Sequence, residues 1–170
     1  MRYAQIRNMD IINGNGIGVA LFTQGCRFHC KNCFNMNLWN FDEGKEWTEE
    51  TKDKILSLVA KPYITRFSVL GGEPLSKENI DDLLVLLKDI KEQYPNKQIW
   101  VYTGYAFEEI PKLNYNAKDL LPYIDTMVDG LYIDELKDLT LSYRGSSNQR
   151  VIDVQQSLQM DEIVKRDVEK

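Results

Sequence analysis

The three cysteines of this 170-residue chain, Cys26, Cys30 and Cys33, lie within eight residues at the spacing Cys-x3-Cys-x2-Cys, and there is no fourth cysteine. Three thiolates leave one iron of a four-iron cluster without a cysteine ligand, whereas clusters that only transfer electrons usually have four. An iron with an open position can bind a substrate or cofactor. The pattern therefore predicts a cluster that does chemistry on a bound molecule, and radical chemistry with S-adenosylmethionine is the leading hypothesis.

The same cysteines also fit other kinds of site. Their odd number, and the lack of an apolar run long enough for a signal peptide, disfavour disulfides and favour reduced thiols in the cytoplasm. Zinc is the main alternative, because the sole histidine, His29, lies inside the motif and can complete a tetrahedral site. His29 directly precedes Cys30, however, and structural zinc ligands normally come as two separated pairs. The spacing favours iron-sulfur over zinc, with free or redox-active thiols as a third interpretation.

Length and composition limit the remaining choices. With 43% hydrophobic and 28% charged residues, the chain is expected to form one domain over residues 1–170, with a core of its own. The net charge of −5 and the absence of a basic block disfavour nucleic acid and acidic membranes as partners. We therefore expect a cytoplasmic protein that binds neither.

Apolar runs predict strands that alternate with helices. The strands are expected at residues 19–23, 67–70, 98–102 and 126–128. Thr48 is expected to cap a helix that ends near Lys61, and a second helix is expected to begin at Ser76. The second helix has an apolar stripe at helical spacing, made of Ile80, Leu83, Leu84, Leu87 and Ile90. This order predicts an α/β fold, a parallel sheet with helical crossovers.

Parallel sheets bind ligands at the carboxyl ends of their strands, where the loops converge. These ends carry polar or glycine-containing signatures: Gly25-Cys26, Gly71-Gly72-Glu73-Pro74, Thr103-Gly104-Tyr105 and Asp129-Gly130. Each alone is consistent with a simple turn, but together they predict one site. We expect Gly71 and Gly72 to let the backbone approach a ligand that a side chain would block. We expect Glu73 to accept hydrogen bonds from an ammonium group, and Asp129 either to hold a ribose or to order its strand end.

These residues together resemble the radical S-adenosylmethionine superfamily and, within it, the enzymes that activate glycyl-radical enzymes. The segments that carry the resemblance are the cysteine loop, the turn at 71–74, and residues 10–14, 33–35, 100–105, 128–130 and 143–150. They extend from the first residues to about Ile152. Several such motifs are far more specific than the cysteine spacing alone.

The resemblance implies a [4Fe-4S] cluster on Cys26, Cys30 and Cys33, with S-adenosylmethionine on the fourth iron. The implied cofactor contacts are Asn32, Cys33 and Phe34 at the adenine end, and Gly71, Gly72, Glu73 and Pro74 at the methionyl end. The product would be a glycyl radical on a protein partner, an anaerobic ribonucleoside-triphosphate reductase. Reduced flavodoxin or a similar protein would supply the electron.

The implied fold is an open partial β/α (TIM-like) barrel, because eight full repeats take roughly 250 residues. The chain departs from its relatives in two places. Asn32, rather than an aromatic residue, precedes the third cysteine, and residues 14–18 lack the proline and arginine that relatives often carry there. Apolar residues in the tail at 153–170 predict a terminal helix. The polar segment 143–150 is expected to meet the partner or to be an ordinary surface loop.

Two other functions stay open from sequence. One is a radical S-adenosylmethionine enzyme that acts on a small molecule, as the deazapurine carboxylate synthases do. The other is an iron-sulfur or zinc-binding module without turnover.

Overall fold

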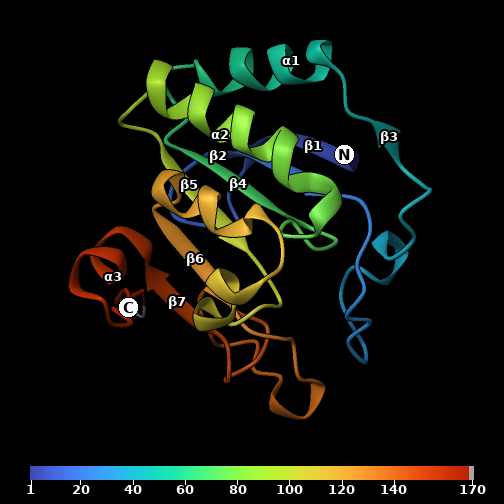
Figure 1. Ribbon diagram of the computed structural model, residues 1–170, viewed down its shortest axis with the longest axis vertical. Coiled ribbons are helices and arrows are strands. Elements are labelled where there is room, and N and C mark those ends of the chain that lie inside the picture. Colours follow the sequence, from blue (N-terminus) through green and yellow to red (C-terminus); the bar gives the residue numbers. More distant parts are fainter. Residues whose placement is uncertain (169–170) are drawn as a thin grey trace.

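The sheet is mixed, with a parallel centre and antiparallel edges (Figure 1). The computed structural model describes residues 1–168. The seven strands run in the order β3-β1-β2-β4-β5-β6-β7. Their bounds are β1 Arg2–Asp10, β2 Gly18–Thr23, β3 Lys45–Glu46, β4 Arg66–Gly71, β5 Gln98–Tyr102, β6 Thr126–Asp129 and β7 Arg150–Asp153.

The four strands predicted from the sequence form the parallel centre. β2, β4, β5 and β6 pair in parallel, so their carboxyl ends lie at one edge of the sheet. Both faces of β2 are buried: Val19 and Leu21 belong to the main core, while Ala20 and Phe22 belong to a smaller cluster on the other face. This explains why these strands read as continuous apolar runs.

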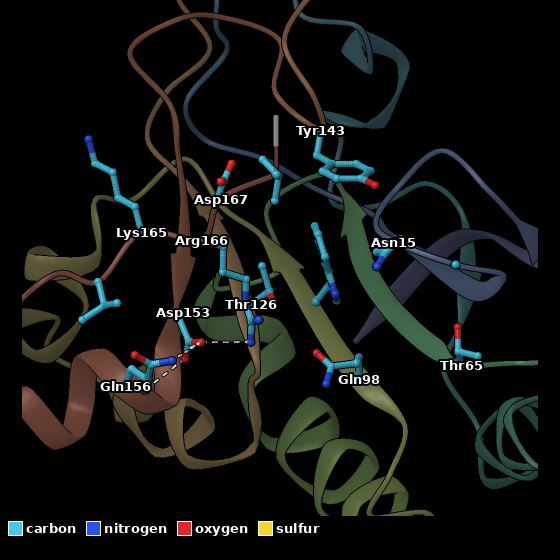
Figure 2. A pocket seen from close by; sticks show the side chains of 14 residues that line it. Asn15, Thr65, Gln98, Thr126, Tyr143, Asp153, Gln156, Lys165, Arg166 and Asp167 are labelled. Carbon is cyan, nitrogen blue, oxygen red and sulfur yellow. Dashed lines mark hydrogen bonds and ion pairs between the residues drawn. The ribbon is translucent and has the colours of Figure 1, made fainter. Parts of the chain in front are cut away.

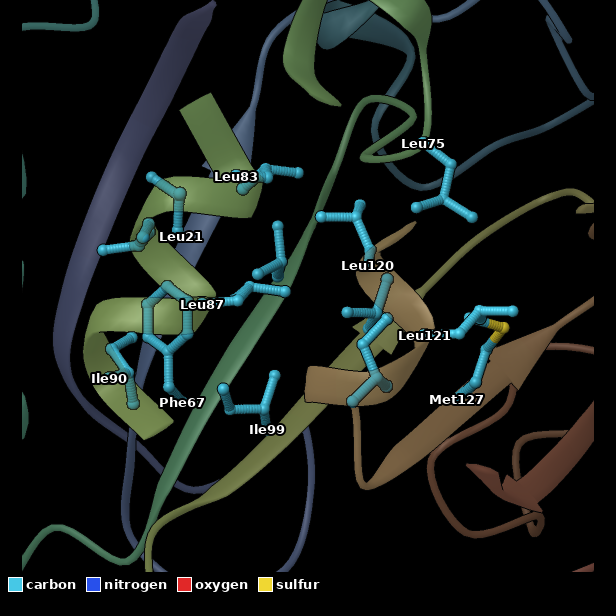
Figure 3. Packing of buried hydrophobic residues seen from close by; sticks show 14 of the residues in the cluster. Leu21, Phe67, Leu75, Leu83, Leu87, Ile90, Ile99, Leu120, Leu121 and Met127 are labelled. Atoms are coloured by element: carbon cyan, nitrogen blue, oxygen red, sulfur yellow. The ribbon is translucent and has the colours of Figure 1, made fainter. Parts of the chain in front are cut away.

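The helices cover one face of the sheet and enclose the main core. α1 (Glu49–Val59) begins after Thr48, whose side chain accepts a hydrogen bond from the Thr51 amide as predicted. α2 (Ile80–Gln93) follows a short 3₁₀ turn, η2 (Lys77–Asn79). Figure 3 shows Leu83, Leu87 and Ile90 of α2 against Leu21 and Phe67 of the sheet. The predicted apolar stripe is confirmed except that Leu86 is fully buried and Leu84 only partly. Within residues 1–168 no helix has the length and apolar character to cross a membrane.

The crossover from β5 to β6 contains no α-helix. Two 3₁₀ helices replace it, η3 (Phe107–Lys112) and η4 (Asn116–Tyr123). Each contains a proline, Pro111 or Pro122, which lacks the amide hydrogen that a longer α-helix needs. Leu120 and Leu121 of η4 still pack into the core beside Met127 (Figure 3).

The sequence analysis missed both antiparallel edges of the sheet. β1 pairs with β2, and β7 pairs with β6. The prediction of a helical tail over 153–170 was wrong beyond Met160: α3 covers only Val154–Met160, and the chain turns at Asp161 in the left-handed region. Residues 164–166 then run along β7, with a bridge between Ile152 and Lys165. They cover an edge that would otherwise present unpaired backbone groups. Residues 169 and 170 lie outside the described range.

A buried arginine, Arg66, organises the face of the sheet opposite the helices. Its guanidinium donates to the carbonyls of Asn13, Asn15 and Gly16, and to Asp10 through both the carbonyl and the carboxylate, at 2.8–3.3 Å. Arg66 is the first residue of β4, and its side chain is fully buried, with 0% exposure.

The glycine loop at residues 14–18 is shaped around this side chain. A Cβ atom on Gly14 would lie 2.4 Å from Arg66 Cδ, and one on Gly18 would lie 2.6 Å from Arg66 Cζ. The loop thus has no arginine of its own. The guanidinium of Arg66, from β4, occupies the space inside it. Sequence analysis did not select Arg66, because a charged residue beside an apolar run reads as the end of the strand.

Replacing Arg66 with Met is expected to destabilise the fold by about 3–5 kcal/mol, because the buried Asp10 carboxylate would lose its ion-pair partner and three loop carbonyls would lose a donor. The free energy of unfolding from urea titration measures this. Lys88→Met removes an exposed cation on α2 and is the control, expected to change stability by less than about 0.5 kcal/mol. Equal effects of the two variants would contradict the structural role given to Arg66.

Candidate functional site

The cysteine loop begins directly at the carboxyl end of β2. Gly25 N donates to Leu38 O at 2.7 Å and Cys26 N to Trp39 O at 3.1 Å, so the loop closes back on its own end. The three cysteines, all partly exposed, line one cavity of about 510 Å³. The cavity also contains residues from the carboxyl ends of β4, β5 and β6. The predicted convergence of these strand ends is confirmed.

The turn at residues 71–74 rests on the start of the cysteine loop through backbone hydrogen bonds. Gly72 N donates to Thr23 O and Glu73 N donates to Gly25 O, both at 2.8 Å. Asn35, just after the third cysteine, adds a side-chain bond to Gly71 O at 3.3 Å, and its amide lies 3.4 Å from Cys33 Sγ. The cysteines and the turn are therefore held as one unit.

The cysteine loop gives a structural reason for glycine at position 72. A Cβ atom there would lie 2.3 Å from Gly25 O and 2.9 Å from Gly25 N. These are backbone atoms of the cysteine loop, which cannot move aside as a flexible side chain can. The missing side chain thus makes room for the loop. Gly71 and Gly72 both line the cavity as well, and their close approach to a ligand stays a prediction.

Glu73 is a buried carboxylate without a cationic partner among its hydrogen bonds. Oε1 accepts from Leu75 N at 2.9 Å and from Thr103 Oγ1 at 2.6 Å, and Oε2 accepts from Gly104 N at 2.8 Å. These three neutral donors lower its pKa, but desolvation outweighs them and raises the pKa of Glu73 to about 7. A cation in the cavity would favour the ionised form.

Burial also changes the pKa values of thiols in the cysteine loop. Desolvation is the largest cause that raises the pKa of the Cys26 and Cys30 thiols, and the Glu73 carboxylate adds to it. Metal binding to these thiols must therefore release protons.

The other predicted contact residues divide between the cavity wall and its surroundings. Phe34 lines the cavity and packs against Tyr132, with ring centroids 5.2 Å apart. Asn32 is exposed, has a left-handed backbone, and donates to Asp134 Oδ2 at 2.8 Å rather than lining the cavity. Pro74 is buried beneath the turn and is not part of the wall.

Asp129 is buried at the end of β6, and its carboxylate is occupied by protein groups. It accepts from Phe107 N at 2.7 Å and forms an ion pair with Arg150, which also pairs with Glu108. The neighbouring residues Val128 and Gly130 line the cavity but Asp129 does not. Of the two roles considered for it, ordering the strand end is the one that these contacts display.

Three contributors were not selected from the sequence for the roles the structure gives them. Thr103 and Asn35 hold the turn and the cysteine loop, and Arg150 ties β7 to β6 through Asp129. All three belong to segments that carried the resemblance, which is the signal that could have identified them. His29 stacks on Trp39 at a centroid distance of 4.3 Å.

A larger cavity, about 950 Å³, lies at the other end of the parallel strands (Figure 2). It is lined by residues at the amino ends of the parallel strands, including Thr65, Gln98 and Thr126, and by the tail at 164–168. No cysteine reaches it. Size alone therefore does not identify the site.

Comparison with known proteins agrees with the cysteine-lined cavity. A family model described as a 4Fe-4S single cluster domain matches residues 12–152. The anaerobic ribonucleoside-triphosphate reductase-activating protein of Salmonella typhimurium is 40% identical over 153 residues, covering 89% of this chain and 97% of that protein. The chain belongs to this family.

Other relatives of the same name support this membership. The protein of Vibrio cholerae is 39% identical over 151 residues, covering 88% of this chain and 96% of that protein. That of enterobacteria phage T4 is 37% identical over 151 residues, covering 89% and 93%. The resemblance seen in the motifs is confirmed.

The thiols fit a cluster better than a single metal ion. Within residues 1–168, no three histidine, cysteine, aspartate or glutamate side chains are grouped closely enough to hold one ion. Zinc would need its sulfurs to converge at about 2.3 Å from a common centre. A cube binds each cysteine on a different iron, so thiols spread around one cavity suit it.

Gly72→Ala is expected to lower the unfolding free energy by about 1–3 kcal/mol and to reduce the iron bound after reconstitution, because the methyl group would push the cysteine loop away. Thermal unfolding and iron content measure the two effects. Gly130→Ala is the control. Gly130 has a positive φ of 95°, but a Cβ atom there would lie no closer than 3.8 Å to its neighbours, so the substitution is expected to strain the backbone without a clash. Normal iron content with weakened cofactor binding alone would instead mean that Gly72 makes room for the ligand.

A second prediction concerns pH. The folded pKa of Glu73, about 7, lies above its ordinary value of 4.5, so the folded state holds the proton more tightly. The stability that Glu73 contributes is therefore full below about pH 4.5 and is lost as the pH rises through 7, by up to about 3 kcal/mol.

Urea unfolding of the cofactor-free protein between about pH 5 and about pH 8 tests this against Glu73→Gln, which has no such titration. Wild type should lose stability with rising pH relative to the variant. Parallel curves would show that the carboxylate is already ionised throughout.

Proposed function

We propose that this protein uses a [4Fe-4S] cluster and S-adenosylmethionine to place a glycyl radical on an anaerobic ribonucleoside-triphosphate reductase. The observation that carries the proposal is the direct backbone contact between the turn at 71–74 and the three-cysteine loop at one cavity. Membership of the activating-protein family supports the reductase as partner.

When bound, the cluster and cofactor supply reductive cleavage of the sulfonium to methionine and a 5′-deoxyadenosyl radical, which takes a hydrogen from the partner's glycine. The chain's own residues hold and shield these groups. Cys26, Cys30 and Cys33 are the cluster ligands. Apolar Phe22, Phe28 and Leu70 line the cavity and limit the entry of water.

Polar groups would orient the cofactor within the cavity. Glu73 lines the cavity with only neutral donors around its carboxyl group, so an ammonium group nearby would favour its ionised form. Gly71 and Gly72 line the wall beside it, and the buried Pro74 follows in their turn. Phe34 with Tyr132 offers ring faces at the adenine end, next to Cys33.

Asn32 and Asp129 would act indirectly, by holding other parts of the site in place. Asn32 holds the loop to Asp134 beside Phe34. Asp129 fixes the end of β6 through Arg150, and a contact from it to the ribose would need that pair to rearrange.

The wider features are part of the same proposal. β2, β4, β5 and β6, with helices on one face and the site at their carboxyl ends, represent part of an open β/α barrel. Residues 1–168 share one main core across the sheet and helices, which supports a single domain. A cytoplasmic location, and reduced flavodoxin or a similar electron donor, complete it.

The test is anaerobic reconstitution with iron and sulfide, then assays for 5′-deoxyadenosine and, after addition of the reductase, for a glycyl radical by electron paramagnetic resonance. Cys30→Ala should lose the cluster absorbance and both products. His29→Ala, which removes a neighbouring side chain that stacks on Trp39, should keep all three.

Each other result points elsewhere. 5′-Deoxyadenosine without a radical on the reductase would favour a small-molecule substrate. A cluster without any cleavage would favour a non-catalytic module, and loss of metal in His29→Ala would revive a zinc site.

A further inference from the structure

The connection from β6 to β7 forms an arm, residues 130–149, that lies beside the cysteine loop at one end of the sheet (Figure 1). Polar side chains near its end hold it together from within. Gln149 accepts from Gly145 N at 2.9 Å and donates to Gly130 O at 3.0 Å, while Asn148 donates to Leu131 O at 2.7 Å. Asn148 and Gln149 of the segment 143–150 therefore hold the shape of the arm itself.

The arm is also fixed to the cysteine loop. Asp134 accepts from Asn32, Glu135 pairs with Lys31 at 3.4 Å, and Tyr132 packs on Phe34. The position of the arm thus follows that of the cluster ligands.

Besides exposed polar groups, the arm presents apolar side chains outward. Leu139, on the cavity wall, is 76% exposed, and Leu131, Ile133 and Leu136 are each at least 37% exposed. An apolar side chain this exposed adds little to the stability of the fold, because most of it stays in water.

Two other segments place exposed apolar side chains around the same cavity. Ile12, from the loop between β1 and β2, is 68% exposed, and Phe34, from the cysteine loop, is 62% exposed. Ile12, Phe34 and Leu139 come from three separate parts of the chain and line one opening, which we call the apolar rim. Gathered apolar exposure of this kind marks an interaction site.

We propose that the apolar rim is the surface on which the reductase docks, through an apolar segment that covers Leu139, Phe34 and Ile12 and enters the cavity. This rests on the proposed function and adds the contact surface and its chemistry. Any occupant must pass the rim to reach the cysteines behind it, and a protein whose glycine enters the cavity covers the rim over a wider surface than a small cofactor does. A second copy of this chain on the rim would block that route.

The experiment measures the affinity of the reconstituted protein for the reductase by calorimetry, with Leu139→Asp and Ile12→Asp as variants from two different segments. Both side chains are mostly exposed, so folding should be unaffected. Each variant is expected to weaken binding by about tenfold or more, because a charge would be buried against an apolar partner. Val85→Asp is the matched control, an apolar residue of α2 that is 48% exposed on the helical face, and should bind as wild type does.

Two further readouts separate this proposal from the proposed function. Glycyl-radical yield should fall more than 5′-deoxyadenosine formed without reductase. If wild type forms no radical yet the rim variants bind more weakly than Val85→Asp, the rim stands and the proposed chemistry fails. If wild type forms the radical and the rim variants bind as tightly as the control, or wild type does not bind the reductase, the docking proposal is overturned. Sedimentation that shows a wild-type dimer lost in Leu139→Asp, with reductase affinity unchanged, would assign the rim to a second copy instead.

Discussion

The site depends on the closeness of two strand ends. β2 and β4 are parallel neighbours, so the chain leaves both at the same edge, and the turn after β4 lies directly on the start of the cysteine loop after β2. The contact is backbone to backbone at Gly72 and Gly25, where no side chain fits. The cysteine loop and the turn at 71–74 are consequently positioned by the register of two strands and need no long side chain to bring them together.

Two buried charges support that register from different sides. Arg66 lies under the glycine loop that leads into β2, and its partners come from that loop and from Asp10. Glu73 joins the turn to the end of β5 through Thr103 and Gly104. Arg66 is a paired, fully bonded ion and stabilises the fold. Glu73 is a carboxyl group with a raised pKa and no cationic partner among its hydrogen bonds, which suits a group that meets a charged ligand.

Sequence reasoning reached the parallel centre and most of the cavity because both follow from short-range patterns. The apolar runs identify β2, β4, β5 and β6, and the residues after each run mark one edge. It missed β1 because a strand that is largely exposed carries charges, as in Arg2 and Arg7, and it missed the end of α3 because apolar residues spaced through a tail fit a helix and an edge strand alike. The backbone of Gly25 that a Cβ atom on Gly72 would meet, and the arginine that pairs with Asp129, both lie far along the chain from these residues. No local pattern encodes such contacts.

The proposed function requires that a cluster held by three thiolates keeps one iron free to bind S-adenosylmethionine. The most direct test is the electron paramagnetic resonance spectrum of the reduced, reconstituted protein, recorded before and after addition of S-adenosylmethionine. Coordination of the cofactor to the open iron predicts a change in the cluster signal, with methionine alone causing less. An unchanged signal at saturating cofactor would mean that the fourth iron is closed or that the cavity does not bind this cofactor.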